Sequence, residues 1–418
     1  MGETFVQKVF SKKVGKKVVH GEIVVVEPDY VMSHDNAAPI SKIFAKFGVD
    51  KVKYPDRIVI ILDHTVPAPT EVEASNHKLI REFVKTQGIP NFYDINNGIC
   101  HQVLPEKGYA LPSKIILGSD SHTTTYGAFG AFSAGIGRTE VASIWATGEL
   151  WMKVPEVHKF IIKGKLPEGV FAKDVALHII GEIGADGATY KAVEFSGEVA
   201  SEFSIASRMV LSNMAAEMGA KAGYFLPDEK TLEYVKNITK SDYEILTSDE
   251  DAEYEKVLEF DISSLTPQIA KPHTVDNVSP IDEVLGTKIH QGLIGTCTNG
   301  RLEDLEIAAK ILKGKKVKAG VRCLVFAASM QEYIKALKNG IFEIFAESGC
   351  VIMNPGCGPC LGAHEGVLAP GEVAISTANR NFKGRMGSRE AFIYLASPAT
   401  VAASVIEGEI TDPRKYIL

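Results

Sequence analysis

Short apolar runs alternate with amphipathic stretches along most of the chain. The run 57–66 (RIVIILDHTV) is apolar through its first half, as expected for a strand buried on both faces. The stretch 71–88 carries apolar residues at helical spacing and closes on Gly88, a common helix stop. Because strand and helix patterns keep alternating, the sequence predicts an α/β fold.

The clearest alternation lies in the last third of the chain. Strand-like runs at 288–295, 321–329 and 350–356 are separated by helix-like stretches at 301–314 and 330–349. Right-handed crossovers assemble such a βαβαβ order into a parallel sheet. Ligands of parallel sheets bind where strands end and helices begin, so polar residues just after these strands are candidate site residues.

A chain of 418 residues is too long for one hydrophobic core. We divide it into three α/β domains, at 1–155, 156–280 and 281–418. The polar, proline-containing stretch 263–280 is the best linker candidate. Residues 158–169 are typical of a hairpin, and we interpret the glycine-rich run 127–137 as tight packing.

Composition narrows the class of partner. The net charge of −7 argues against a nucleic-acid binder, as it does against a basic membrane-surface protein. The first residues lack a signal-peptide core, and the longest apolar run is too short to span a bilayer. Six cysteines in such a chain indicate a reducing cytoplasm, with a small molecule or another protein as partner.

Three of the six cysteines follow predicted strands of one domain. Cys297 lies in GTCTNGR, and Cys357 and Cys360 form the Cys-x-x-Cys pair of NPGCGPCLGAH. The other three lie in apolar surroundings, where we expect ordinary core packing: Cys100, Cys323 and Cys350.

Three kinds of site remain open for these cysteines. A structural zinc ion needs four ligands, and His364 is near enough in sequence to be the fourth. A redox dithiol needs only the pair and leaves Cys297 unexplained. A four-iron cluster held by three thiolates keeps one iron without a protein ligand, available to a substrate oxygen as a Lewis acid.

The sequence resembles the aconitase superfamily, on the branch of the large subunits of 3-isopropylmalate dehydratase and homoaconitase. The resemblance covers nearly the whole chain through these motifs in order: LDHTVPAP, CHQVLPEKG, GSDSHTTTYGAFGAFSAGIG, GADGATYKAVEFSG, GTCTNGRLEDL, NPGCGPCLGAHEG and ANRNFKGRMG. It implies three α/β domains around a cluster crevice, without the C-terminal swivel domain of single-chain aconitases. It also implies a [4Fe-4S] cluster bound by Cys297, Cys357 and Cys360, with one iron not ligated by protein.

The resemblance assigns the acid–base residues as well. Asp63 and His64 correspond to a pair that protonates the leaving hydroxyl, a role that an imidazolium beside a carboxylate suits. Asp120 is implied to pair with His101, and His122 with Glu194. Two further candidates, His34 and Asp35, fall in a matching region where citrate-using relatives carry a glutamine and this chain has Pro39.

Substrate binding is expected from the 378–387 segment and from the loop at Asp120. Arg380 and Arg385 can grip carboxylates with two-pronged forks, and Asn379 can add a hydrogen bond. The resemblance adds Ser121 to the substrate-binding residues. A solvated basic loop is the alternative interpretation of the segment.

The function implied is a hydro-lyase that isomerises 2-isopropylmalate and 3-isopropylmalate by dehydration and rehydration, in leucine biosynthesis. A homoaconitase large subunit is the close alternative, and a non-enzymatic metal- or RNA-binding role is the alternative from another class. The family's serine base lies in the swivel domain, and no serine here sits in a matching motif. We therefore expect a separate small subunit, in a heterodimer or heterotetramer.

Overall fold

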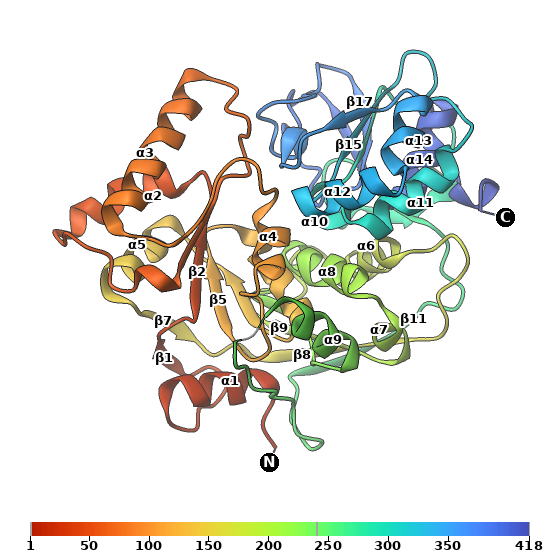
Figure 1. Cartoon of the computed structure of the whole chain (residues 1–418). Helices are drawn as coiled ribbons and strands as arrows, with labels where there is room; N and C mark the ends of the chain where they lie inside the picture. The colour runs from red at the N-terminus through yellow and green to blue at the C-terminus, as the bar shows by residue number, and fades with distance from the viewer. Residues whose placement is uncertain (1, 240, 418) are drawn as a thin grey trace.

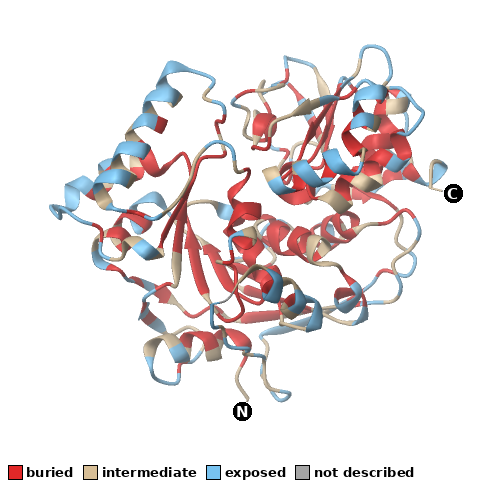
Figure 2. Cartoon of the chain, viewed as in Figure 1, coloured by how far each residue is buried: buried red, intermediate tan, exposed pale blue. Residues whose placement is uncertain are grey.

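The computed structural model describes residues 2–239 and 241–417. Its strands form three main sheets and one two-stranded ribbon, so the predicted α/β class is confirmed. In Figure 1, the sheet formed by strands between residues 268 and 395 appears with its helices as a blue and cyan unit. It lies above the green helices of the sheet formed by strands between residues 157 and 261. Buried positions concentrate in the strands and on the helix faces that cover them (Figure 2).

The first sheet has the order β4-β3-β2-β5-β6 and is parallel throughout. Its strands are β2 (Tyr30–Ser33), β3 (Ile58–Ile61), β4 (Asn91–Tyr93), β5 (Ile115–Gly118) and β6 (Phe132–Gly135). The helices around it are α1 (Phe5–Val14), α2 (Ala37–Phe44), α3 (Glu71–Gln87), α4 (Cys100–Glu106) and α5 (Arg138–Thr147), beside the ribbon of β1 (Ile23–Val26) and β7 (Leu150–Lys153). As predicted, α3 stops at Gly88, whose φ of 69° is the left-handed conformation that glycine adopts freely.

The second sheet, of order β10-β9-β8-β11, is also parallel. It consists of β8 (Val157–Lys163), β9 (Ala192–Ser196), β10 (Ala222–Phe225) and β11 (Lys256–Asp261), with α6 (Ala172–Ile183), α7 (Glu198–Glu202), α8 (Ile205–Met214) and α9 (Glu229–Ile238). The hairpin predicted at 158–169 is wrong. The chain leaves β8 and enters α6, because both neighbours that hydrogen-bond to β8 come from distant sequence and run parallel to it.

The third sheet has the order β13-β12-β18-β17-β14-β15-β16. Its strands are β12 (Gln268–Ala270), β13 (Val278–Pro280), β14 (Gln291–Ile294), β15 (Arg322–Phe326), β16 (Val351–Met353), β17 (Val373–Ser376) and β18 (Phe392–Leu395). The predicted βαβαβ unit is confirmed, since β14, β15 and β16 pair in parallel. The helices are α10 (Thr296–Asn299), α11 (Leu302–Leu312), α12 (Met330–Lys338), α13 (Ile341–Ser348) and α14 (Pro398–Glu407). The single helix predicted at 330–349 is two, divided at Gly340 with φ 69°.

The stretch interpreted as a linker, 263–280, is part of the third sheet. It supplies β12 and β13, which pair with each other in antiparallel fashion, and β12 continues onto β18. Polar and proline-containing segments form strands at sheet edges, where one row of backbone groups needs no partner. The third structural unit therefore takes in residues before 281.

The glycine-rich run packs tightly, as interpreted. Its first residues, 127–129, end η3 (Ser121–Phe129), a 3₁₀ segment that lies against α8 and β10 of the second sheet, and its later residues include β6. A Cβ atom added at Gly127 would stand 1.9 Å from the carbonyl oxygen of Gly223. This close backbone approach joins the first and second sheets directly behind the loop that carries Asp120.

The described helices include none whose length and apolar content would suffice to cross a lipid bilayer.

Candidate active site

Three loops of the first sheet meet at one edge. The loop after β2 carries His34 and Asp35, the loop after β3 carries Asp63 and His64, and the loop after β5 leads to Asp120. Because β3, β2 and β5 are neighbours in a parallel sheet, their carboxyl ends lie side by side. The sequence prediction that strand-end polar residues gather is confirmed for these loops.

Asp35 shapes the loop that presents His64. Its carboxylate accepts hydrogen bonds from the backbone N–H groups of Asp63 (2.9 Å), His64 (2.8 Å) and Thr65 (3.2 Å). The Nε2 of His77, on α3, lies 2.8 Å from the same carboxylate. Burial would raise the pKa of Asp35, but His77 and the neighbouring imidazoles hold it well below its usual value. Asp35 is thus a fixed negative charge beneath the loop.

His64 lies between two carboxylates. Its Nδ1 is 2.5 Å from Asp63 Oδ1, and its Nε2 is 3.3 Å from Asp120 Oδ2. The other oxygen of Asp63 accepts the backbone N–H of Cys100 at 2.7 Å, which fixes the carboxylate. Burial alone would lower the pKa of His64, but Asp63, the Cys357 thiol and Asp120 raise it well above its usual value. The ring is therefore charged at neutral pH and able to give a proton.

His34 stacks on His64. The ring centroids are 3.7 Å apart with an interplanar angle of 16°. Burial and the charge of His64 lower the pKa of His34 to about 4. The two rings therefore differ in charge: a neutral imidazole covers one face of the imidazolium.

Asp120 connects several histidines. Its Oδ1 lies 2.9 Å from His101 Nε2, which confirms the implied pairing, and it accepts the His122 backbone N–H at 2.8 Å. Burial would raise the pKa of Asp120, but His101, His122 and His64 hold it well below its usual value. Ser121, beside it, is exposed at the start of η3.

The predicted partner of His122 is wrong. His122 Nε2 lies 2.7 Å from Glu217 Oε1, and the Nε of Arg380 donates to the two oxygens of the same carboxylate at 2.8 and 3.0 Å. Glu217 lies in η4 (Ala215–Met218), directly after α8. Burial would raise its pKa, but His122 and Arg380 hold it below the usual value. The available sequence signal was an isolated acid in the apolar stretch NMAAEMG, just before the helix stop.

Glu194 forms a separate buried cluster. It is 1% exposed on β9, and its carboxylate accepts hydrogen bonds from Tyr224 (3.1 Å), Ser248 (2.8 Å) and Tyr254 (2.9 Å). The ammonium of Lys159 lies 3.6 Å away. These partners satisfy the carboxylate without any contact to His122, which is the behaviour of an acid that stabilises packing.

The three candidate ligand cysteines follow strands of the third sheet, as predicted. Cys297 lies on α10 after β14, and Cys357 and Cys360 lie at η6 (Gly358–Leu361) after β16. The turn into α10 requires Gly295, whose φ is 132° and whose added Cβ would stand 2.1 Å from the Phe326 carbonyl oxygen. The buried guanidinium of Arg301 donates to the carbonyl of Cys297 at 2.8 Å and steadies the turn.

Hydrogen-bond donors point at the sulfur atoms. The side-chain amides of Asn213 and Asn379 both donate to Cys297 Sγ at 3.3 Å, and Arg385 Nη2 is 3.7 Å from Cys360 Sγ. Burial raises the pKa of the Cys297 thiol to about 11, and burial likewise raises that of Cys357. This arrangement suits thiolates held by a metal centre. Ligation removes the proton of each thiol, and the neighbouring donors then stabilise the resulting anion.

The arrangement disfavours a single zinc ion. Zinc bonds of about 2.3 Å bring ligand atoms within roughly 4 Å of one another. Among the described residues, the groups of His, Cys, Asp and Glu with ligand atoms within 4.8 Å of one another do not include the three cysteines. His364 instead places its Nε2 3.2 Å from the carbonyl oxygen of His64. A cluster binds each thiolate through a different iron, so it does not require the three sulfur atoms to lie this close to one another.

The remaining cysteines pack as expected. Cys100 and Cys323 are fully buried, and Cys350 lies beside Cys323 just before β16. The arginine segment is only partly solvated: Asn379 and Asn381 are each 1% exposed, whereas Phe382 and Lys383 between the two arginines are exposed. The Nε of Arg385 is buried without a hydrogen-bond partner among the described residues. The side chains of Asn379 and Arg385 lie beside the cysteines, where a ligand or cluster can accept their hydrogen bonds.

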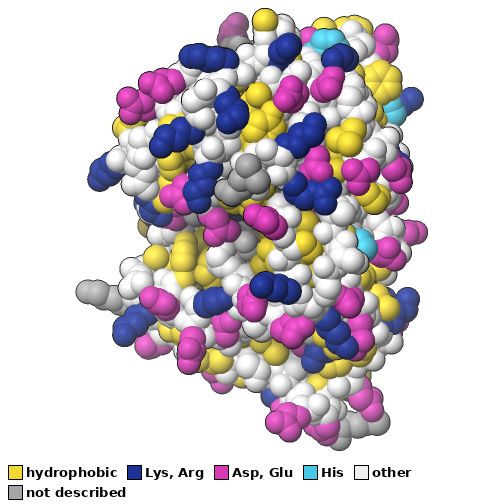
Figure 3. Space-filling view, turned by 90° about the vertical axis from the view of Figure 1, so that its right-hand side faces the viewer, with side chains coloured by type: hydrophobic (Ala, Val, Ile, Leu, Met, Phe, Trp, Pro, Cys, Tyr) yellow, Lys and Arg dark blue, Asp and Glu magenta, His cyan; other side chains and the backbone are white. Residues whose placement is uncertain are grey.

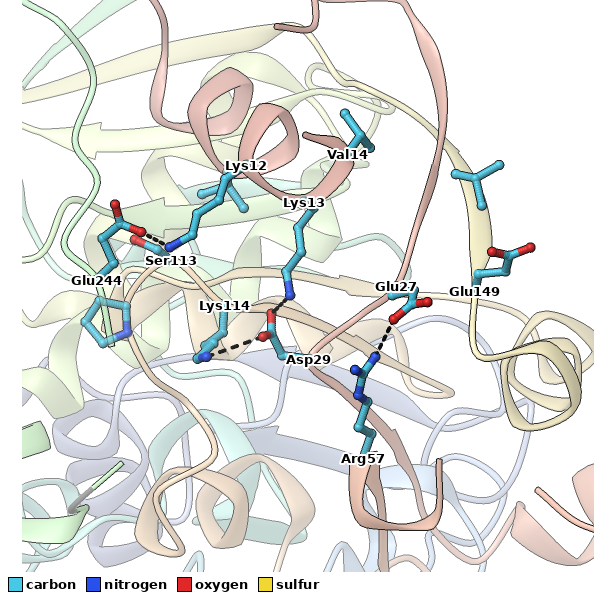
Figure 4. A pocket seen from close by; sticks show the side chains of 13 residues that line it. Lys12, Lys13, Val14, Glu27, Asp29, Arg57, Ser113, Lys114, Glu149 and Glu244 are labelled. Atoms are coloured by element: carbon cyan, nitrogen blue, oxygen red, sulfur yellow. Dashed lines mark hydrogen bonds and ion pairs between the residues drawn. The ribbon is translucent and has the colours of Figure 1, made fainter. Parts of the chain in front are cut away.

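Another cavity lies away from these residues. Figure 4 shows this cavity of about 600 Å³ between α1 and the first sheet. Its cations are paired internally: Lys13 and Lys114 with Asp29, Arg57 with Glu27 and Lys12 with Glu244. A smaller cavity of about 370 Å³ lies beside Ser121, lined also by Ala216 and Lys221. On the face shown in Figure 3, cations and anions are interspersed, so that face lacks the one-signed field of a nucleic-acid binder.

Comparisons with known proteins agree with this geometry. The "Aconitase family (aconitate hydratase)" matches residues 7–288 and 282–408. The chain is 54% identical to "3-isopropylmalate dehydratase large subunit 1" of Methanopyrus kandleri, over 100% of both chains. It is 56% identical to "Probable methanogen homoaconitase large subunit" of Methanosarcina mazei, over 94% of this chain and 100% of that one.

A solved structure shares the fold. The crystal structure of Thermococcus kodakaraensis aconitase X in its holo-form superimposes with a TM-score of 0.50 over 93% of each chain, at 13% identity. At that identity the likeness concerns the arrangement of elements alone.

Proposed function

Because the chain belongs to the aconitase family, we propose that it is the large subunit of a hydro-lyase that interconverts 2-isopropylmalate and 3-isopropylmalate. The observation that carries the proposal is one continuous polar network. It runs from Asp63 through His64, Asp120 and His122 to Glu217, and it ends on Arg380 beside the cysteine segment.

Family membership implies an iron–sulfur cluster. We infer that Cys297, Cys357 and Cys360 hold a [4Fe-4S] cluster of which one iron has no protein ligand. When bound, such a cluster supplies a Lewis acid that makes a substrate hydroxyl a better leaving group. The donors from Asn213, Asn379 and Arg385 support this assignment because they are already aimed at the sulfur atoms or lie beside them.

The chain's own acid–base chemistry centres on His64. Asp63 and Asp120 flank its ring and keep it protonated, so it can deliver a proton to the departing hydroxyl oxygen. Once that proton has left, the ring becomes neutral and the same two carboxylates favour its return. This reversibility suits a reaction in which water leaves and re-adds.

In this proposal Arg380 and Arg385 bind the substrate carboxylates. Glu217 engages only the Nε of Arg380, and among the described residues no partner engages its two Nη groups. The bond from Nε to Glu217 already fixes the guanidinium in place. The two Nη groups are therefore preorganised to bind a substrate carboxylate. Arg385 brings a second fork, whose Nε is still unpartnered, and exposed Ser121 adds a hydroxyl.

A small subunit completes the proposed enzyme. Relatives are named as large subunits, and the site's histidines and carboxylates are already engaged with one another rather than free to act as a strong base. We propose that the base and the pocket for the substrate's side group come from that partner, in a heterodimer or heterotetramer.

A homoaconitase large subunit is the second candidate. It is favoured by the 56% identity to the Methanosarcina mazei relative, which is of the same order as the 54% to the Methanopyrus kandleri one. Both reactions use the same acid, the same carboxylate binders and the same cysteines. They differ in the substituent, which the small subunit contacts in our proposal.

The test is a substrate panel on anaerobically reconstituted protein. The chain is assayed alone and with candidate small subunits on 3-isopropylmalate and homoaconitate. We expect turnover only with a small subunit, and preference for 3-isopropylmalate. Turnover of homoaconitate alone would select the second candidate, and a full rate from the isolated chain would overturn the two-subunit proposal.

A further inference from the structure

Lys173 is a buried cation whose donors are all used. It lies on α6, is 0% exposed, and its ammonium donates to the carbonyl oxygens of Thr377 (2.9 Å) and Ala378 (2.7 Å). The sulfur of Met214, 3.7 Å away, accepts a third contact. An ammonium has three protons, so its hydrogen-bonding capacity is filled without any charged partner.

Lys173 lacks an acidic partner among the described residues, and this is unusual for a buried lysine. A fully buried lysine is normally paired with an acid, because an isolated charge is costly in a protein interior. Among the described residues, no carboxylate stands within ion-pair distance of Lys173. Its neighbour Asp174 turns away, to accept the backbone N–H groups of Phe171 and Gln268, both at 2.9 Å.

The cysteine site lies next to the contacts of Lys173: Met214 follows Asn213 and Ala378 precedes Asn379, and both asparagine amides donate to Cys297 Sγ at 3.3 Å. Burial lowers the pKa of Lys173 to about 8, and the groups that oppose this most are the thiols of Cys297 and Cys360, followed by Glu217. If both thiols are ligated as thiolates, this attraction becomes stronger than in the metal-free chain. The cation is thus placed where ligation creates negative charge.

Lys173 also holds the segment that carries the substrate-binding residues. Thr377 and Ala378 directly precede Asn379 and Arg380. The hydroxyl of Thr377 accepts the Gly295 N–H at 2.9 Å and lies 2.9 Å from the Gly295 carbonyl, at the turn that leads to Cys297. Figure 1 shows α6 next to α8, at the border with the third sheet. Lys173 of the second unit therefore holds one loop of the third unit, and the Thr377 side chain links that loop to the turn before Cys297.

We propose that Lys173 is a positioning residue whose fixed positive charge offsets the negative charge of the thiolate-bound iron–sulfur cluster. The inference rests on the proposed function, and it adds a charge-compensating residue that reaches the cluster through the protein matrix without touching it.

The first experiment measures how firmly the cluster is held. Lys173→Gln keeps an amide that can donate to the two carbonyls but removes the charge, whereas Lys173→Met removes both. Each variant is reconstituted with iron and sulfide, then exposed to an iron chelator while the visible absorption is followed. We expect both variants to hold the cluster more weakly by about 10- to 100-fold, as for other groups that orient metal ligands.

The matched control is Lys230→Met. Lys230 also donates to several backbone carbonyls, those of Ser201, Glu202 and Phe203, but it is exposed on α9 and belongs to another part of the chain. We expect this variant to retain the cluster as the wild type does. Equal retention by Lys173→Gln and the wild type would overturn the proposal.

A second readout separates charge from structure. The midpoint potential for one-electron reduction of the bound cluster should move to more negative values in Lys173→Gln, because reduction adds negative charge where a cation has been removed. Thermal unfolding of the metal-free proteins should be similar for Lys173→Gln and the wild type. An unchanged potential, or a loss of the cluster that only follows lower stability of the metal-free protein, would refute the charge role.

The same experiment distinguishes this inference from the proposed function. If the wild type itself takes up no cluster under reconstitution, the proposed function fails and Lys173 loses the anion it was assigned to. If the wild type binds a cluster and Lys173→Gln binds it with equal strength and potential, only the charge-compensating role fails.

Discussion

Glu217 provides the sharpest test of the site, because the chain contains a second buried glutamate that serves as its control. Glu217→Gln keeps the size of the side chain and removes its charge. Two contacts then lose their ionised acceptor, that of His122 Nε2 at 2.7 Å and the ion pair with Arg380 Nε at 2.8 Å. Glu194→Gln makes the same change in the tyrosine and serine cluster on β9.

The expected size follows from the bonds lost. A hydrogen bond to a charged group contributes about 1 kcal/mol more than a neutral one, and the loosened Arg380 fork adds a further loss in substrate binding. A total of about 2–3 kcal/mol in transition-state stabilisation corresponds to a fall in kcat/KM of roughly 30- to 160-fold. Glu194→Gln should instead lower the thermal stability and leave kcat/KM within about threefold of the wild type.

The assay combines the reconstituted variant with a small subunit and measures kcat and KM for the substrate that the wild type uses. Thermal unfolding of each variant is measured in parallel. The reasoning is refuted if Glu194→Gln loses activity at unchanged stability while Glu217→Gln retains it, since the originally implied pairing would then be the functional one.

Three further predictions follow from the site. Cys297→Ser should abolish cluster absorption and activity, whereas Cys323→Ser in the core should spare both; bleaching by the second change alone would contradict the ligand assignment. Arg380→Lys keeps the charge but loses the fork and the fixed contact to Glu217, and should cost about 2–3 kcal/mol of substrate or transition-state binding, measured as kcat/KM. An unchanged kcat/KM would remove Arg380 from the site. Asp63→Asn should lower kcat far more than it changes KM, because it deprives His64 of the carboxylate that keeps it charged; a selective rise in KM would speak against the proton-donor role.

Local order was accessible from the sequence. The alternation of apolar runs and amphipathic stretches predicted the α/β class, and Gly88 marked the end of α3 because its backbone conformation depends on nearest neighbours alone. The cysteines could also be placed after strands, since the polar loop directly follows the apolar run in each case. Asp63, His64 and Asp120 were found for the same reason, although the resemblance to a family, rather than periodicity, gave them roles.

Long-range packing decided the rest. Residues 263–280 resembled a linker, yet they pair at the edge of the third sheet because β18, more than a hundred residues later, offers a free edge to β12. Residues 158–169 resembled a hairpin, but they form most of β8 and part of the loop that leads to α6. The strands that pair with β8 come from elsewhere in the chain.

The acid that meets His122 was beyond the reach of the sequence for the same physical reason. The pattern gives each residue's position on its own helix or strand, but not which of two buried acids faces a histidine almost a hundred residues away. Tight packing of η3 on α8 and β10, made possible by the approach of Gly127 to Gly223, brings Glu217 to His122 and leaves Glu194 on the sheet behind. Lys173 shows the same division: its sequence context is an ordinary helix start, and only the docking of α6 against the third sheet makes it the buried neighbour of Thr377 and Ala378.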